Sequence, residues 1–570
     1  MYKITLTPII ASVLIGLVAL ADAAKIEELV PANSLVYVTI SEFDEIWDAA
    51  AASESWQAMF KSGEMEQTME VMRFTIGTNL IGIVETFGRQ IAFVIMPPQS
   101  GKNDIKMALI LDTGGLRKEA EDIISKVSTV MTMNAEKVRA NPNAGRYRKI
   151  FYGTITLEKR TFRYGFIDDL LVIGLKEGGF KAIVDTYRKK TASIARDAKF
   201  KDMRKKFANV QIFGYANIDN ALPILKANEN AEVVKFERTL QSTTLKFDLE
   251  SSGLQSIDAI GLGMDVFSVD GLQKLYIQMK ENPPYPPLAK GEKRTSRTEG
   301  VTTSGFVNSI FREWRDVNPL LSLHGLGKPS TSDVFFAMSS SNLNDLWQFL
   351  FDNNDFQEEI QELEDASGLD FETEILNSLT GEIVMSANTS NESSERTTAS
   401  ISWKELVAFM GVKERAKWET TIDAIQELTD TTTQSEYNYK GVTIRTLSPP
   451  QNELSNTFGY ALTDRSFIAA TSTDKIQSII DGTATMKRSK TADNLFKGLP
   501  APPSLFLHLN LDKLLPYMLN RAGACEYSIS PNSDGLWMCL RIISGKNLID
   551  SLGEIAPVLV PSDLRNSNFR

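Results

Sequence analysis

Residues 31–41 read PANSLVYVTIS, and residues 329–339 read PSTSDVFFAMS. The two stretches align without a gap at an offset of 298 residues, and each is followed by an aliphatic residue and a tryptophan, at Ile46-Trp47 and Leu346-Trp347. A proline and small polar residues that lead into a run of β-branched and aromatic residues are typical of a loop entering a strand. Because similar segments at a fixed spacing indicate an internal repeat, we predict equivalent strands at 35–40 and 333–338 that open two copies of one module.

Four further pairs of similar segments occur in the same order in both halves, at offsets between 287 and 300 residues. They are 88–96 with 381–386, 107–111 with 407–410, 152–156 with 439–444, and 164–173 with 460–469. One such pair is a weak signal, but five collinear pairs at nearly constant spacing indicate a duplication.

The boundary between the copies is predicted from a proline-rich segment. Residues 282–291 read NPPYPPLAKG and continue into a charged run that ends at Gly300. Closely spaced prolines cannot join a central strand ladder and favour an extended spacer. We therefore expect a first module at 24–281, a linker at 282–300 and a second module at 301–570. Helical spacing at 306–324 predicts a helix that opens the second module.

Each copy is predicted to mix strands and helices. Residues 91–96 form a second strand-length apolar run, and residues 162–175 predict two strands joined at Asp168-Asp169. Apolar residues at helical spacing predict helices at 116–127, 179–187 and 474–480. Several gaps between strands are too short for a parallel crossover of about a dozen residues. We therefore expect an α+β fold, in which each copy is a mostly antiparallel sheet with helices packed on one face.

The N-terminus is typical of a secretory signal peptide. A single lysine, Lys3, precedes an apolar run at 4–20, and Ala21-Asp22-Ala23 supplies a small-x-small cleavage pattern. We predict a signal peptide at 1–23 and an exported protein, periplasmic or extracellular. The alternative is retention as a membrane anchor, because the apolar run reaches the lower limit of about 17 residues for spanning a bilayer. Membrane contact is expected only through this segment, if it is uncleaved.

Composition narrows the possible functions. The chain has 570 residues, of which 42% are hydrophobic and 23% charged, as in ordinary globular proteins. Its net charge of -11 lacks the basic field that phosphate backbones attract, so no nucleic acid is expected as a partner. Only two histidines, His324 and His508, and two cysteines are present, which leaves few residues for metal or nucleophile–histidine chemistry. No cofactor is expected.

The chain resembles an uncharacterised family of exported, internally repeated bacterial proteins, built on a domain of unknown function. That family carries a proline-led strand soon after a signal peptide, and a segment of the type found here at 368–383, GLDFETEILNSLTGEI. The first copy departs from this segment, with NLIGIVETFG at 79–88. The resemblance implies export and architecture, and no activity.

Asp112-Thr113-Gly114 matches the aspartic-protease signature, a carboxylate on a tight turn at a strand end. That chemistry needs two carboxylates that share a proton, and the residue at an offset of 300 is Val412. The alternative is a strand-to-helix turn whose polar residues cap the helix.

Ser472 and Lys475 match the Ser-x-x-Lys motif of penicillin-interacting enzymes, but its usual partner motifs, Ser-Asp-Asn and Lys-Thr-Gly, are absent. Ser472 also stands where an N-cap is expected, and we favour that role.

His508 lies in the alternating strand LFLHLNL at 505–511. With Cys525 and Cys539 it could supply three zinc ligands, but close ligand pairs are lacking. We therefore predict a surface or rim histidine and no metal site.

Cys525 and Cys539 flank a strong turn signal, PNSDG at 531–535. A hairpin centred at Asn532 sets the two cysteines opposite each other, and an exported chain meets an oxidising compartment. We predict a Cys525–Cys539 disulfide. Two unpaired thiols are expected instead if the hairpin register slips.

Trp47 and Trp347 follow the first strand of each copy, and a core role is expected for both; an exposed ligand platform is the alternative. No catalytic residue is assigned. We expect a non-catalytic, envelope-associated or secreted protein that binds another macromolecule or an apolar ligand. The alternative is a secreted hydrolase that uses carboxylates such as Asp112, Asp168 or Asp169 without a recognisable motif.

Overall fold

The computed structural model of the chain describes residues 23–280 and 332–543, apart from internal gaps, and divides them into two compact units. The described residues of unit 1 lie within 23–227 and 257–280, and those of unit 2 are Ser256 and residues within 332–543. The predicted signal peptide, the linker at 282–300, His324 and Trp347 lie outside the described residues. The internal gaps are 53–56, 58–62, 99–104, 135–137, 158–159, 177, 228–255, 341–342, 344–353, 390–402, 429–431, 449–457, 485–498, 501–502, 511–512, 514–523 and 533.

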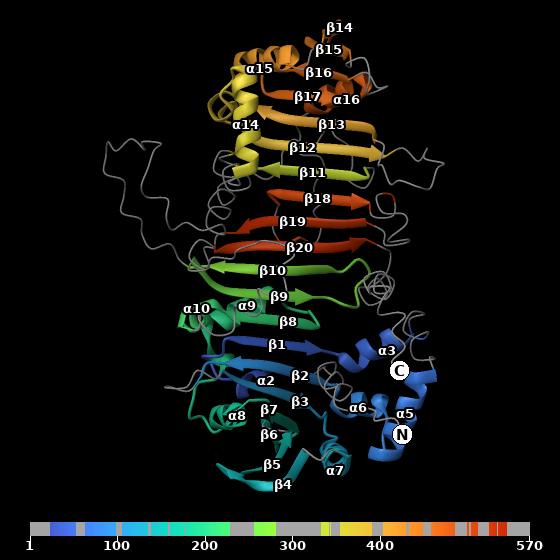
Figure 1. Ribbon diagram of the computed structural model, residues 1–570, viewed down its shortest axis with the longest axis vertical. Coiled ribbons are helices and arrows are strands. Elements are labelled where there is room, and N and C mark those ends of the chain that lie inside the picture. The colour runs from blue at the N-terminus through green and yellow to red at the C-terminus, as the bar shows by residue number, and fades with distance from the viewer. Residues whose placement is uncertain are drawn as a thin grey trace, which may run out of the picture. The chain divides into compact units, whose positions relative to one another are not determined.

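The described part of unit 1 contains an antiparallel sheet whose strands run in the spatial order β4-β5-β6-β7-β3-β2-β1-β8-β9-β10 (Figure 1). Its strands are β1 (Val36–Ser41), β2 (Gln90–Met96), β3 (Lys106–Asp112), β4 (Val138–Tyr147), β5 (Ile150–Leu157), β6 (Arg160–Ile167), β7 (Leu170–Gly174), β8 (Ile212–Asn217), β9 (Ile257–Met264) and β10 (Leu272–Met279). Its helices are α2 (Ala23–Leu29), α3 (Phe43–Ala52), α5 (Gly63–Ile76), α6 (Leu80–Phe87), α7 (Arg117–Asn134), α8 (Gly179–Tyr187), α9 (Ala198–Lys206) and α10 (Ile218–Ala227), with a 3-10 turn at Ile194–Arg196.

The described part of unit 2 contains an antiparallel sheet in the order β14-β15-β16-β17-β13-β12-β11-β18-β19-β20 (Figure 1). Its strands are β11 (Val334–Ser339), β12 (Leu379–Thr389), β13 (Trp403–Val412), β14 (Thr432–Tyr439), β15 (Val442–Ser448), β16 (Phe458–Leu462), β17 (Ser466–Ala470), β18 (Leu505–Asn510), β19 (Ala524–Asn532) and β20 (Gly535–Ile543). Its helices are α14 (Asn354–Ser367), α15 (Arg415–Leu428) and α16 (Thr473–Ala484), with short π and 3-10 turns at Phe371–Ile375 and Leu376–Ser378.

Helices cover both faces of the sheet in unit 1, so the prediction of helices on one face is wrong. The register aligns Ile91, Leu111 and Leu171 on one face, where they form a core with α5, α6 and α7. On the opposite face α8 places Phe180 against Gly165 so closely that a Cβ there would lie 3.1 Å from its ring. The central strand β3 is accordingly buried at five consecutive residues, 108–112. A continuous apolar run of this kind marks a strand buried on both faces, whereas a half-buried strand alternates.

Both faces of the sheet in unit 2 also carry helices. The side chains of Ile476 and Ile479 in α16 pack with Phe335, Phe409 and other residues of one face. On the other face, Trp418 of α15 stacks on Phe467 with ring centroids 5.4 Å apart. Trp418 and Phe467 therefore fix α15 against the strand β17.

The α+β character and the antiparallel pairing are as predicted from sequence. The strands expected at 35–40 and 333–338 are β1 and β11, the turn at Asp168-Asp169 joins β6 to β7, and the helix at 179–187 is α8. None of the described helices is long and apolar enough to span a membrane.

Candidate functional site

Asp112, Thr113 and Gly114 form the turn between β3 and α7. Asp112 is buried, and its Oδ1 accepts a hydrogen bond of 2.8 Å from the backbone N–H of Gly114. Gly114 has φ 57°, a left-handed conformation that favours glycine. Asp112 lies opposite Leu170, as Gly411 lies opposite Ser466 at the corresponding strand end in unit 2. Gly411 has no carboxylate, so this pairing offers no partner for an aspartic-protease dyad, as the residue at the offset of 300 also indicated.

The turn at Asp168-Asp169 lies beside the Asp112 turn. The Thr113 hydroxyl donates to the Asp169 carbonyl oxygen at 2.8 Å, and Arg117 Nη1 donates to the Asp168 carbonyl oxygen at 2.9 Å. Asp168 also accepts long contacts of 3.4 Å from the Tyr187 hydroxyl. The structure thus brings together all three aspartates proposed for a hydrolase. The hydrogen bonds made by Asp112 and by the carbonyl groups of Asp168 and Asp169 connect the end of β3, the β6–β7 turn and the start of α7.

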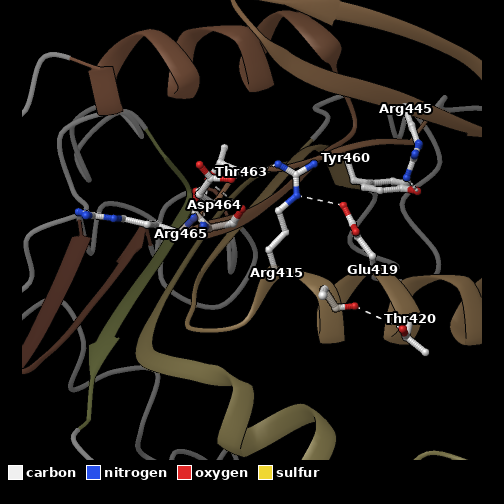
Figure 2. A network of polar contacts seen from close by, with 10 residues as sticks. Arg415, Glu419, Thr420, Arg445, Tyr460, Thr463, Asp464 and Arg465 are labelled. Atoms are coloured by element: carbon white, nitrogen blue, oxygen red, sulfur yellow. Dashed lines mark hydrogen bonds and ion pairs between the residues drawn. The ribbon is translucent and has the colours of Figure 1, made fainter.

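Unit 2 has a similar polar network at the start of α15 (Figure 2). Arg415 Nε lies 3.0 Å from Glu419 Oε1, and its Nη1 lies 3.2 Å from Asp464 Oδ1 in the turn between β16 and β17. The hydrogen bonds that Arg415 donates to Glu419 and Asp464 raise its pKa. The Asp464 side chain is 91% exposed, and surface ion pairs of this kind contribute little stability. A guanidinium stays protonated at neutral pH, so Arg415 is not suited to act as a general acid or base.

Ser472 directly precedes α16, and its carbonyl accepts from the backbone N–H of Ile476 at 3.4 Å. It therefore occupies the N-cap position predicted for it. The ammonium group of Lys475 lies 3.3 Å from Glu405 Oε1 on β13. Lys475 is thus engaged by a carboxylate on another element.

His508 is buried, with 3% of its surface exposed, so the prediction of a surface histidine is wrong. It lies opposite Glu526 on β19, which lies opposite Arg541 on β20. His508 Nδ1 is 3.4 Å from Glu526 Oε1, and Arg541 Nη1 is 3.3 Å from Glu526 Oε2. Alternation along β18 gives His508 the same face as Phe506, and that face is buried. Glu526 and Arg541 are site residues that the sequence argument missed.

The predicted hairpin forms, but its register overturns the predicted disulfide. Asn532 pairs with Gly535, and this tighter turn sets Cys525 opposite Ile542 and Cys539 opposite Ser528. Cys525 and Ser528 are three residues apart on one strand, so the two sulfurs face opposite sides of the sheet. Both cysteines carry thiols and are not bonded to each other. The described residues also contain no group of three or more His, Cys, Asp or Glu side chains placed to hold a metal ion.

Trp47 in α3 packs on the core formed with α5, α6 and α7, with its ring centroid 5.9 Å from that of Phe43. The predicted core role is therefore confirmed for Trp47, while Trp347 lies outside the described residues.

A buried acid in α2 had no sequence signal. Glu27 is 8% exposed, and Arg204 Nε lies 3.5 Å from its Oε1. Burial raises the pKa of Glu27 to about 7, although the charge of Arg204 acts in the opposite direction. Glu27 lies in a short helix whose sequence gives no indication of its partner on α9.

No protein-family model matches the chain, and no curated protein shows significant similarity to it. Among solved structures, the chain is similar to "Structure of crystal form I of TP0453", with a TM-score of 0.22 and 11% identity over 44% of this chain and 100% of that one. It is also similar to "Structure of crystal form III of TP0453", with a TM-score of 0.22 and 12% identity over 43% of this chain and 99% of that one. Similarity at this level supports no inference about function.

Proposed function

We propose that the chain is an exported, non-catalytic binding protein built from two copies of one α+β module. The observation that carries the proposal is the correspondence of the two sheets. Reading β11 to β20 in place of β1 to β10 turns the strand order of unit 1 into that of unit 2. The helix after β3 also corresponds to the helix after β13, as does the helix after β7 to that after β17.

A repeated polar contact supports the same proposal. In unit 1 the Tyr147 hydroxyl donates to Asp185 of α8 at 3.0 Å, and Arg148 forms an ion pair with the same carboxylate. In unit 2 the Tyr439 hydroxyl donates to Asp481 Oδ2 of α16 at 3.1 Å, and Lys440 Nζ lies 2.8 Å from Asp481 Oδ1. We call each of these contacts a hairpin lock, because it ties a two-residue hairpin turn to the following helix.

The network at the helix starts is repeated as well. Arg117 pairs with Glu121 and reaches the turn after β6, as Arg415 pairs with Glu419 and reaches the turn after β16. These recurring polar residues connect elements of the scaffold. Because the repeated residues hold the scaffold together, we expect the function to depend on surface residues that differ between the two units. Surface residues that vary on a common scaffold are what a binding protein needs.

Export is part of the proposal and rests on the N-terminal segment. The test is to express the full chain in a bacterium, fractionate the cells and sequence the N-terminus of the recovered protein. We expect a periplasmic or secreted chain that begins near Ala24. A chain that keeps Met1 and stays in carbonate-washed membranes would support the anchor alternative, and one that keeps Met1 in the cytoplasm would refute export.

A further inference from the structure

The most distinctive surface of unit 1 is a set of basic side chains around its hairpin lock. We call it the basic cluster; it comprises Arg146, Arg148, Lys149, Lys181, Arg188, Lys189 and Lys190. Arg188 Nε donates to the Arg148 carbonyl oxygen at 3.1 Å, and Lys181 Nζ lies 5.4 Å from the centre of the Tyr147 ring. These contacts place the turn between β4 and β5 against both ends of α8. The cluster stands out in a chain whose net charge is -11.

The cluster exceeds what the fold requires. In unit 2 the hairpin lock is made with one cation, Lys440. Counting from the lock tyrosine and aspartate, the positions of the other six cations are taken by Asn438, Gly441, Gln477, Ala484, Thr485 and Met486. Among the described hydrogen bonds, two carboxylates contact the hairpin lock or α8: Asp185 accepts from Tyr147, and Asp168 accepts from Tyr187. The additional cations therefore leave a strong local excess of positive charge on unit 1.

An exposed aromatic side chain lies next to one of the cations, on the face of the β4–β5 hairpin opposite α8. Phe151 is 69% exposed on β5, and Arg146, its neighbour across β4, holds its guanidinium 5.0 Å from the ring centre. The corresponding residue in unit 2 is Thr443. Cations that attract anionic headgroups, beside an aromatic ring that can enter the interface, are the combination found in surface-bound membrane proteins.

We propose that the tip of the β4–β5 hairpin, with Phe151 and Arg146 on one face and the other cations of the basic cluster at the turn and on α8, is a docking surface for a membrane that contains anionic lipid. This proposal rests on the proposed function, since it names the partner of an exported, envelope-associated chain, and it uses a contact other than the N-terminal segment. β4 is the end strand of the described sheet in unit 1, so its hairpin can meet a flat surface at its tip. At physiological salt, charges beyond about 8 Å are largely screened, so an acidic chain can still present a basic tip to such a surface. An extended nucleic acid would need a longer basic track.

The test is sedimentation of the full mature chain with vesicles of phosphatidylglycerol and phosphatidylcholine in equal parts, and with vesicles of phosphatidylcholine alone. We expect binding to the anionic vesicles that weakens with added salt, and far weaker binding to the neutral ones. Because each basic residue near the surface contributes about 1 kcal/mol, Lys149→Gln, Lys189→Gln and Lys190→Gln together should weaken binding on the order of 100-fold. Phe151→Ser should weaken it about tenfold.

The matched control is Lys118→Gln on α7 with Lys201→Gln and Lys205→Gln on α9. It removes three positive charges, as the cluster variant does, but outside the basic cluster, and it should bind as the parent does. Equal binding to neutral vesicles, or no loss in the cluster variant, would overturn the proposal. So would tighter binding to a single-stranded oligonucleotide than to the anionic vesicles, or a dimer that dissociates in the cluster variant. If the chain binds vesicles but is not exported, the docking surface stands and the export proposal is refuted. If the chain is exported but does not bind vesicles, the export proposal stands and the docking surface is refuted.

Discussion

At the scale of single residues, the chain buries polar and acidic side chains close to partners on other elements. The buried Glu27 of α2 lies beside Arg204 of α9, and the buried His508 of β18 lies beside Glu526 of β19. Burial disfavours a charge unless its partner offsets the lost hydration. For Glu27 the offset is incomplete, because the raised pKa shows that burial outweighs the attraction of Arg204.

The first prediction concerns the pH dependence of stability at Glu27. Its pKa is about 7 in the folded chain, against an ordinary value of 4.5, so the folded state holds the proton more tightly. Its contribution is fully present below pH 4.5 and is lost as pH rises through about 7. Urea unfolding of Glu27→Gln and the parent should therefore show the variant gaining relative stability over this range, by at most about 3 kcal/mol. If the difference in the free energy of unfolding between Glu27→Gln and the parent stayed constant with pH, the raised pKa of Glu27 would be contradicted.

The second prediction concerns Cys525 and Cys539. Intact-mass measurement after alkylation in denaturant, without reductant, should show two added groups, because the sulfurs face opposite sides of the sheet. In the native chain Cys539, which is 1% exposed, should react more slowly than Cys525. If the cysteines could be alkylated only after reduction, the result would support a Cys525–Cys539 disulfide.

At the scale of elements, the hairpin lock fixes the β4–β5 turn to α8 and the β14–β15 turn to α16. Arg148 and Lys149 in one turn have φ 46° and 70°, and Lys440 and Gly441 in the other have φ 51° and 85°. Two successive positive φ angles are those of the type I′ turn, whose twist matches that of the strands it joins. The turn therefore sets the hairpin geometry, and the lock aspartate fixes its direction.

The third prediction uses this pair of locks. Tyr147→Phe and Tyr439→Phe each remove one hydroxyl that donates to a helix aspartate, so each should lower the free energy of unfolding by about 1 kcal/mol. Chemical denaturation measures the loss, and Tyr187→Phe, whose hydroxyl makes only contacts of 3.4 Å with Asp168, is the control that should change little. A loss in only one of the two lock variants would count against equivalent locks.

At the scale of the whole molecule, each unit is organised around an interior strand of its sheet, β3 in unit 1 and β13 in unit 2, and β3 is buried at five consecutive residues. β3 pairs with β2 and β7, and β13 pairs with β12 and β17. Their amides are hydrogen-bonded within the sheet, and helices pack on both sides. Stability should therefore be highest at the centre of each sheet and lowest at its end strands.

The fourth prediction is the corresponding pattern of hydrogen exchange. Amides at 108–111 in β3 and at 407–410 in β13 should exchange most slowly within their units, and those of β4 and β14 should exchange faster. Peptide-resolved exchange followed by mass spectrometry measures this. Slow exchange at β4 together with fast exchange at β3 would contradict the strand order.

The local features of this protein could be predicted from its amino-acid sequence. Apolar runs bounded by proline and glycine located β1, β2 and β11, the Asp168-Asp169 turn located the β6–β7 hairpin, and helical spacing located α7 and α8. These features depend on side-chain period and turn chemistry, which a few neighbouring residues specify. The expectation of two modules came from collinear matches of the same local kind.

Strand register, side-chain burial and the partners of buried polar groups emerged from the packing of segments that are distant in the chain. A shift in the turn at Asn532 moved Cys525 away from Cys539 and placed Glu526 between His508 and Arg541. Helices on both faces buried the strand β3, and burial raised the pKa of Glu27 against the charge of Arg204 on α9. Each of these outcomes depends on residues distant in the chain, because the side-chain period of a strand is two and a single slip in pairing reverses every face.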